Sequence, residues 1–120
     1  MKVLFVFHEA HYTGAALALY NEIKWYKENT GIEMCFLVKE KGELLRKLND
    51  YGDVYYWQDF SKKTIFERVK KRLGFKEYKK CLFKKLAKQK INLVYANTIA
   101  TTDIIKFILP LKIKIVWHIH

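Results

Sequence analysis

The chain has 120 residues, 51% of them hydrophobic and 16% aromatic, and its 23 Lys and Arg against 12 Asp and Glu give a formal net charge of +11. This length fits one domain or part of one, and the apolar content excludes intrinsic disorder. Two distant cysteines, Cys35 and Cys81, exclude a disulfide scaffold and fit a reducing compartment. No uncharged apolar run reaches the ~18 residues of a membrane span, and none fits a signal peptide. We therefore expect a cytoplasmic protein, soluble or peripheral at the inner face of the cell membrane.

Apolar runs alternate with segments of helical period along the chain. Lys2–His8 is apolar at successive positions, which is typical of a strand covered on both faces. Gly31 is expected to end the first helix in the left-handed conformation, and Pro110 to stop the last one. The predicted strands are Lys2–His8, Ile32–Val38, Val54–Trp57, Ile91–Tyr95 and Ile113–His120; the predicted helical segments are Ala15–Asn29, Gly42–Tyr51, Ser61–Lys90 and Ile99–Leu109.

This alternation predicts an α/β fold, a Rossmann-like doubly wound parallel sheet of five strands in the order 3-2-1-4-5 with helices on both faces. In such sheets ligands bind at the carboxyl ends of the strands, where the strand order reverses. The residues at and after the strand ends of this edge are the candidate binding residues: His8, Glu9, His11, Tyr12, Thr13 and Gly14 after the first strand, Asn97 and Thr98 after the fourth, and His118 and His120 at the end of the fifth.

The first loop lacks both G-x-G-x-x-G and the P-loop pattern, so no dinucleotide or P-loop site is predicted. Gly14 either only makes the turn or lets a phosphate or sugar approach backbone N–H groups.

His8 and His11 are three residues apart at a strand end, whereas the zinc-protease motif has two histidines four residues apart on a helix. We therefore predict no metal site. For His120 a polar strand end and a ligand hydrogen bond are both open; for His118 the polar strand end is favoured.

The excess positive charge is concentrated in one segment. Between Lys62 and Lys90 there are 13 Lys and Arg and two acids, a sum of +11, whereas the other residues carry 10 of each sign. Two apolar stripes in this segment are typical of a core-facing helix, with the lysines as a solvated face. The same charge could instead form a membrane-docking surface for anionic lipid. Lys70, Lys71, Lys79 and Lys80 are its candidate residues, because they lie off both stripes. Nucleic acid is a less favoured partner, since no binding module is recognisable.

The order of these motifs resembles the N-terminal domain of family 4 retaining glycosyltransferases, which have a GT-B fold. Residues 13–17 (T-G-A-A-L) are similar to the glycine loop and helix start of that family, although Thr13 replaces its first glycine and Ala16 its acidic residue. Residues 94–98 (V-Y-A-N-T) resemble its strand that ends in a polar pair. Residues 115–120 (I-V-W-H-I-H), which follow Pro110, resemble its strand that ends in histidine. The similarity spans nearly the whole chain.

The resemblance implies transfer of a sugar from a nucleotide sugar to an acceptor hydroxyl, with retained anomeric configuration, in surface polysaccharide or glycolipid synthesis. It implies that His120 hydrogen-bonds the donor sugar. His118 matches the strand-end histidine of the family less well than His120 does. The acceptor side would be lined by His11, Tyr12, Thr13, Gly14, Asn97 and Thr98. The nucleotide sugar is a substrate, no cofactor is implied, and the donor would be held by a second Rossmann-like domain that these residues lack. We therefore expect residues 1–120 to be the acceptor-side part of a longer enzyme whose acceptor is a sugar or a lipid-linked molecule. By themselves these residues should be inactive.

Two other functions stay open. The chain could be a non-enzymatic basic α/β module that docks anionic lipid or nucleic acid, or a different Rossmann-like enzyme such as a nucleotide-dependent epimerase. The missing glycine fingerprint argues against the epimerase. A second α/β domain with two closely spaced glutamates in the same reading frame would favour the transferase over the docking module.

Overall fold

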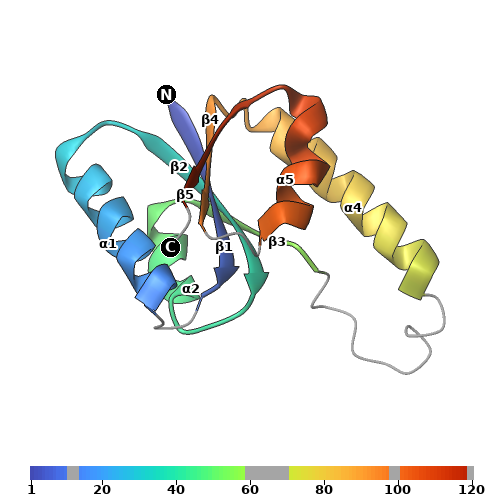
Figure 1. Ribbon diagram of the computed structural model, residues 1–120, viewed down its shortest axis with the longest axis horizontal. Coiled ribbons are helices and arrows are strands. Elements are labelled where there is room, and N and C mark those ends of the chain that lie inside the picture. Colours follow the sequence, from blue (N-terminus) through green and yellow to red (C-terminus); the bar gives the residue numbers. More distant parts are fainter. Residues whose placement is uncertain (11–13, 59–70, 98–100, 119–120) are drawn as a thin grey trace.

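The computed structural model describes residues 1–10, 14–58, 71–97 and 101–118, with side chains except at 71–76 and 118 (Figure 1). Strands and helices alternate along the chain as the sequence predicts. The elements are β1 (Lys2–Glu9), α1 (Gly14–Asn29), β2 (Glu33–Glu40), α2 (Leu45–Tyr51), β3 (Asp53–Tyr56), α4 (Lys71–Lys88), β4 (Leu93–Asn97), α5 (Thr102–Ile108), the 3-10 turn η2 (Leu109–Leu111) and β5 (Lys114–His118).

The five strands form one parallel sheet in the order β3-β2-β1-β4-β5. β1 is its central strand, with Val3 opposite Met34 of β2 on one side and opposite Leu93 of β4 on the other. The Rossmann-like α/β fold and its strand order are therefore confirmed. The carboxyl ends of all five strands lie along one edge of the sheet, because the strands are parallel.

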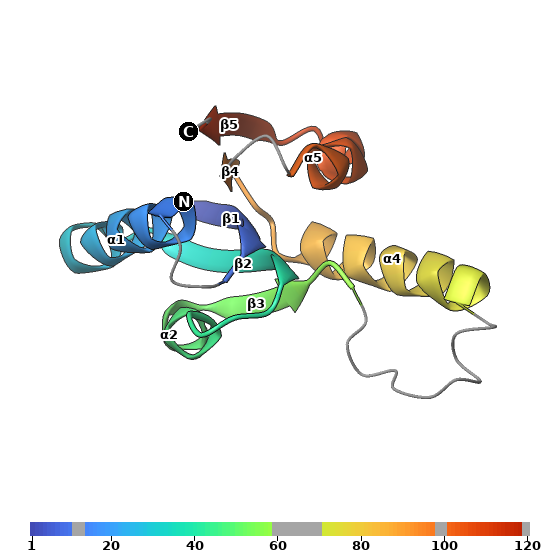
Figure 2. The ribbon, with the colours of Figure 1, turned by 60° about the horizontal axis from the view of Figure 1, so that its bottom comes forward.

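Helices cover both faces of the sheet, with α1 and α2 on one face and α4 and α5 on the other (Figure 2). Successive residues of β1 alternate between the two cores: Val3, Phe5 and Phe7 face α1 and α2, while Leu4 and Val6 face α4 and α5. All five are buried. Such two-sided burial explains why the strand reads as an unbroken apolar run.

Cys35 of β2 is a core residue, as expected. Its side chain is fully buried, and burial raises the pKa of the thiol to about 12. The thiol therefore stays protonated at neutral pH and packs as a small apolar group rather than acting as a nucleophile.

α1 ends through side-chain contacts and not through a left-handed glycine, so the expectation for Gly31 is wrong. No described glycine has a positive φ angle. Instead, the Thr30 hydroxyl and backbone N–H both donate to the Tyr26 carbonyl, at 2.6 and 2.9 Å, and the Asn29 amide donates to the Trp25 carbonyl at 2.9 Å. The Thr30 donors thereby bond one of the last four carbonyls of the helix, which have no partner inside it.

α4 packs one stripe on the sheet and turns the opposite side to solvent. Leu82 and Leu86 are buried, and Tyr78 is half-buried, at the spacing of four that places residues on one helix face. This part of the predicted apolar stripe is confirmed. In the described residues no helix has both the length and the apolar character that crossing a bilayer requires.

Candidate functional site

The carboxyl edge of the sheet has its reversal point between β1 and β4. From β1 the chain continues through α1 and α2 on one face, whereas from β4 it continues through α5 on the other. The two connections therefore diverge beside the strand ends, and this is where open α/β sheets bind ligands. Two groups of polar side chains lie at this edge, one on each face.

On the α1 face, Asn97 joins the end of β4 to the start of α1. Its side chain is 2% exposed, and its amide nitrogen donates to the Ala15 carbonyl at 3.1 Å. Gly14, the first residue of α1, has open space beside it, because a Cβ added there would meet no atom within 4 Å. The first turn of α1 contains no acidic side chain. Unpaired N–H groups at such a helix start favour an anion or an electronegative oxygen.

The structure brings some of the predicted site residues together. Asn97 and His118 are paired in the β4–β5 register, so the two strand ends named by the sequence lie next to each other. Gly14 is connected to them through the Asn97–Ala15 hydrogen bond. The other predicted residues of this edge, His11, Tyr12, Thr13, Thr98 and His120, lie outside the described residues.

On the opposite face, the carboxyl edge carries a second polar group that the sequence did not predict. The Lys39 ammonium and the Asp103 carboxylate form an ion pair at 2.8 Å between the end of β2 and the first turn of α5. Burial alone would raise the pKa of Asp103, but hydrogen bonds from Lys39 and from the Ile104 N–H, together with the Lys39 charge, lower it below its usual value. The carboxylate therefore stays ionised at neutral pH.

His8 stands beside this ion pair. Its neighbours Phe7 and Glu9 pair with Val38 and Glu40, so His8 and Lys39 are side by side in the register. The Nδ1 atom of His8 is buried and has no hydrogen-bond partner in the part of the chain that is described. Buried ring nitrogens are normally satisfied, so this one marks a place where a ligand or water could bind. The strand-end rule already selects His8, and the same signal could have found Lys39, because it directly follows the apolar residues of β2.

Lys79 does not lie on the solvated face where the sequence placed it. It is 8% exposed, its ammonium donates to the Trp57 carbonyl, and it lies 3.2 Å from the centroid of the Trp57 ring. Burial, the largest cause, and the nearby Lys39 charge together lower the pKa of Lys79 to about 8, against the opposing effect of Asp103. Lys79 is therefore removed from any surface that docks a membrane, because its charge is directed toward the protein.

The other lysines singled out in this segment have different outcomes. Lys80 is exposed on α4, in agreement with its position off the apolar stripe. Lys71 is the first residue of α4, where only the backbone is described, and Lys70 lies outside the described residues.

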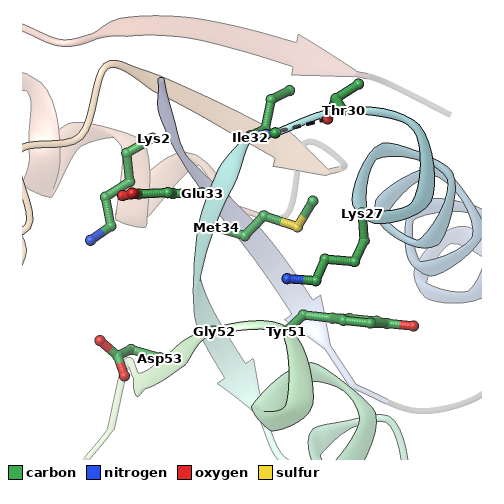
Figure 3. A pocket seen from close by; sticks show the side chains of 10 residues that line it. Lys2, Lys27, Thr30, Ile32, Glu33, Met34, Tyr51, Gly52 and Asp53 are labelled. Atoms are coloured by element: carbon green, nitrogen blue, oxygen red, sulfur yellow. Dashed lines mark hydrogen bonds between the residues drawn. The ribbon is translucent and has the colours of Figure 1, made fainter.

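A cavity of about 390 Å³ lies at the amino edge of the sheet, opposite the strand ends described above (Figure 3). Lys2, Glu33 and Met34 come from the starts of β1 and β2, and Asp53 from the start of β3. Lys27 reaches toward Tyr51 from the last turn of α1 (Figure 3). The lining of this cavity mixes two lysines with two carboxylates, and none of the predicted site residues belongs to it.

Comparison with known proteins supports the fold. No family model matches the sequence, and no curated protein matches it. Among solved structures, the chain is similar to the C-terminal domain, residues 83–215, of a hydrogenase from Pyrococcus furiosus. The TM-score is 0.51 at 13% sequence identity, and the match covers 98% of this chain and 90% of that domain. At this identity the likeness shows the fold alone, so this chain is a Rossmann-like α/β domain.

Proposed function

We propose that this chain is the acceptor-side domain of a retaining glycosyltransferase that acts in surface polysaccharide or glycolipid synthesis. The observation that supports it best is the joined edge of β4 and α1. The buried Asn97 amide bonds Ala15, and Gly14 leaves open space at the helix start beside it. Such a helix start offers backbone N–H groups to the hydroxyl groups of a sugar, with open space beside Gly14.

In this proposal the domain contributes to one side of a cleft. The start of α1 and the end of β4 bind the acceptor, while His120 hydrogen-bonds the donor sugar from the end of β5. A second α/β domain holds the nucleotide sugar. The acceptor oxygen bonds to the anomeric carbon, the bond from that carbon to the nucleoside diphosphate breaks, and the proton of the acceptor hydroxyl passes to the departing phosphate oxygen. The resemblance in motif order, from residues 13–17 to 115–120, supports this assignment of roles.

The proposal is tested by a transfer assay on the whole protein that carries this domain, with a panel of nucleotide sugars and glycan acceptors. We expect a product whose anomeric configuration, read by NMR, is that of the donor. The 120-residue chain alone should give no turnover, because it lacks the donor-binding domain. Robust transfer by the chain alone, or inversion of configuration by the whole protein, would contradict the proposed roles.

We expect His120→Ala in the whole protein to lower turnover by roughly 10²-fold, because one well-placed hydrogen bond in the transition state contributes about 2.7–4 kcal/mol. The matched control is Lys114→Ala, which truncates an exposed side chain at the opposite end of the same strand. His120→Ala kinetics within about threefold of the unmodified enzyme would remove His120 from the site, since that ratio is below 1 kcal/mol.

A further inference from the structure

The exposed side of α4 carries a row of lysines over its C-terminal half. Lys80, Lys84 and Lys88 follow one another at intervals of four residues, and Lys85 lies beside them. All four are exposed, and none forms an ion pair with an acidic side chain in the described part of the chain. We call these four residues the lysine ridge.

The charges of the lysine ridge act together. Residues four apart on a helix are separated by about 6 Å along its axis. This spacing is shorter than the Debye length of about 8 Å at physiological ionic strength, so salt does not isolate each charge from the next. Glu77 is the one acid among residues 77–90. The exposed sides of α1 and α2, across the sheet, mix Lys24, Lys27 and Arg46 with Glu28 and Asp50.

We propose that the lysine ridge docks this protein on an anionic membrane surface. The ridge follows the solvent side of α4, because Lys84 lies two positions from both Leu82 and Leu86, which places it on the side of the helix opposite the buried stripe. α4 itself lies on the face of the sheet away from α1 and α2 (Figures 1 and 2), so the ridge points away from the core. Anionic lipid headgroups complement its charge, and each lysine near such a surface adds to the attraction.

The contact is electrostatic and stays at the headgroups. The apolar residues of α4 that would insert into a bilayer, Leu82 and Leu86, are buried against the sheet. An interfacial helix that inserts needs its apolar face free for the acyl chains, and α4 has already used that face in the core. Binding is therefore reversible and falls steeply as salt concentration rises.

The side-chain chemistry favours lipid over nucleic acid. All four ridge residues are lysines, whereas phosphate recognition in nucleic acids relies heavily on the planar, bidentate guanidinium of arginine. Stacking platforms for unpaired bases also require exposed aromatic rings, and none of the ridge positions is aromatic. A row of lysines without arginine or aromatic residues fits an anionic lipid surface, where the negative headgroups can rearrange laterally and no specific geometry has to be recognised.

The test is cosedimentation of the chain with vesicles of phosphatidylglycerol and phosphatidylcholine, compared with phosphatidylcholine alone. We expect binding to the anionic vesicles only. The variant Lys80→Glu/Lys84→Glu/Lys88→Glu should bind roughly 100-fold more weakly or worse, given the contribution of each lysine near such a surface. Because a triple reversal could also unfold the domain, the thermal midpoint is measured, and the milder Lys80→Gln/Lys84→Gln/Lys88→Gln variant should show the same direction of loss.

The matched control is Lys24→Glu/Lys27→Glu/Arg46→Glu, which makes the same change of charge at exposed positions across the sheet. It should keep most of the binding. An equal loss of vesicle binding in both triple charge-reversal variants would show that the membrane attracts the protein through its net charge alone. That result would overturn the proposal that the lysine ridge is the docking surface. Equal binding to neutral vesicles, or displacement from anionic vesicles by RNA at equal phosphate concentration, would overturn the lipid assignment.

Discussion

Lys79 holds an amine in surroundings that disfavour its charge. In the folded protein its pKa is lowered from 10.5 to about 8, mainly by burial. Between these two values the unfolded chain binds more protons than the folded one, so this residue makes stability rise with pH over that interval. Below pH 8 the cost of the buried charge is fully present, partly offset by the ring and the carbonyl of Trp57.

We expect Lys79→Met to raise the free energy of unfolding by about 1–3 kcal/mol at pH 7, because the unbranched side chain keeps the packing and removes the charge. The advantage over the unmodified protein should shrink as pH rises from 8 toward 10.5. Urea unfolding at several pH values measures it, with exposed Lys80→Met as the control that changes little. A constant difference at every pH would show that the Lys79 charge is not the cause.

Gly52 shows a different residue-scale constraint, which is close approach without backbone strain. Its φ of 173° is extended, but a Cβ there would lie 2.1 Å from the Met34 carbonyl oxygen. We expect Gly52→Ala to destabilise the protein by about 1–3 kcal/mol, because the start of β2 must move away from the turn before β3. Gly31→Ala is the matched control, since nothing lies within 4 Å of its Cβ position. Equal melting temperatures for the two variants would contradict this account.

At the scale of elements, α4 is held to the sheet by a narrow stripe. Leu86 is fully buried among the residues of β1, β4 and α5. We expect Leu86→Ala to lower the free energy of unfolding by about 2–5 kcal/mol through lost burial and the cavity left behind. The adjacent Lys85→Ala removes an exposed side chain and should change stability by no more than about 0.5 kcal/mol. Similar losses in chemical denaturation would mean that α4 is not packed through this stripe.

The elements themselves could be predicted because apolar runs and helical periods record burial on one or two faces. Where an end can be compared within the described residues, it differs from the prediction by up to three residues, since hydrogen bonds and not hydrophobicity define it. The first ten residues of the predicted helical segment Ser61–Lys90 lie outside the described residues. Lys39 and Glu40 extend β2 because the sheet ladder continues, with the Ala10 N–H donating to the Glu40 carbonyl at 3.2 Å. No apolar pattern indicates such a bond.

The candidate site could be predicted only where strand ends supply it. Asn97 and Gly14 follow directly from the rule for parallel sheets. The Lys39–Asp103 ion pair joins residues 64 positions apart, and the buried position of Lys79 depends on the ring of Trp57, which directly follows β3. The helical period of the sequence places Lys79 beside the apolar stripe of its own helix. Trp57, which shields Lys79 from solvent, is brought to it by tertiary packing that the period does not indicate.

At the scale of the whole molecule, the central strand should be the most slowly exchanging part. β1 is paired on both sides, whereas β3 and β5 are the two edges of the sheet. We expect amide hydrogens of β1 to exchange only through global unfolding and those of β5 to exchange through local opening. Hydrogen exchange followed by mass spectrometry measures the difference. Protection in β5 equal to that in β1 would show that the sheet opens as one unit or that its edge is covered.

The pairing of β1 with β4 also constrains synthesis on the ribosome. Val3 pairs with Met34 and with Leu93, so one partner of the central strand is translated about 60 residues after the other. At about 5–20 residues per second, the stretch between β3 and β4 takes roughly 2–7 s to appear. During that interval β3, β2 and β1 can pair. β1 is one of the most apolar strands, and its edge that later pairs with β4 has no neighbour yet. The nascent chain is then most exposed to aggregation, and the lysine-rich stretch that emerges in those seconds gives it the charge repulsion that keeps neighbouring copies apart.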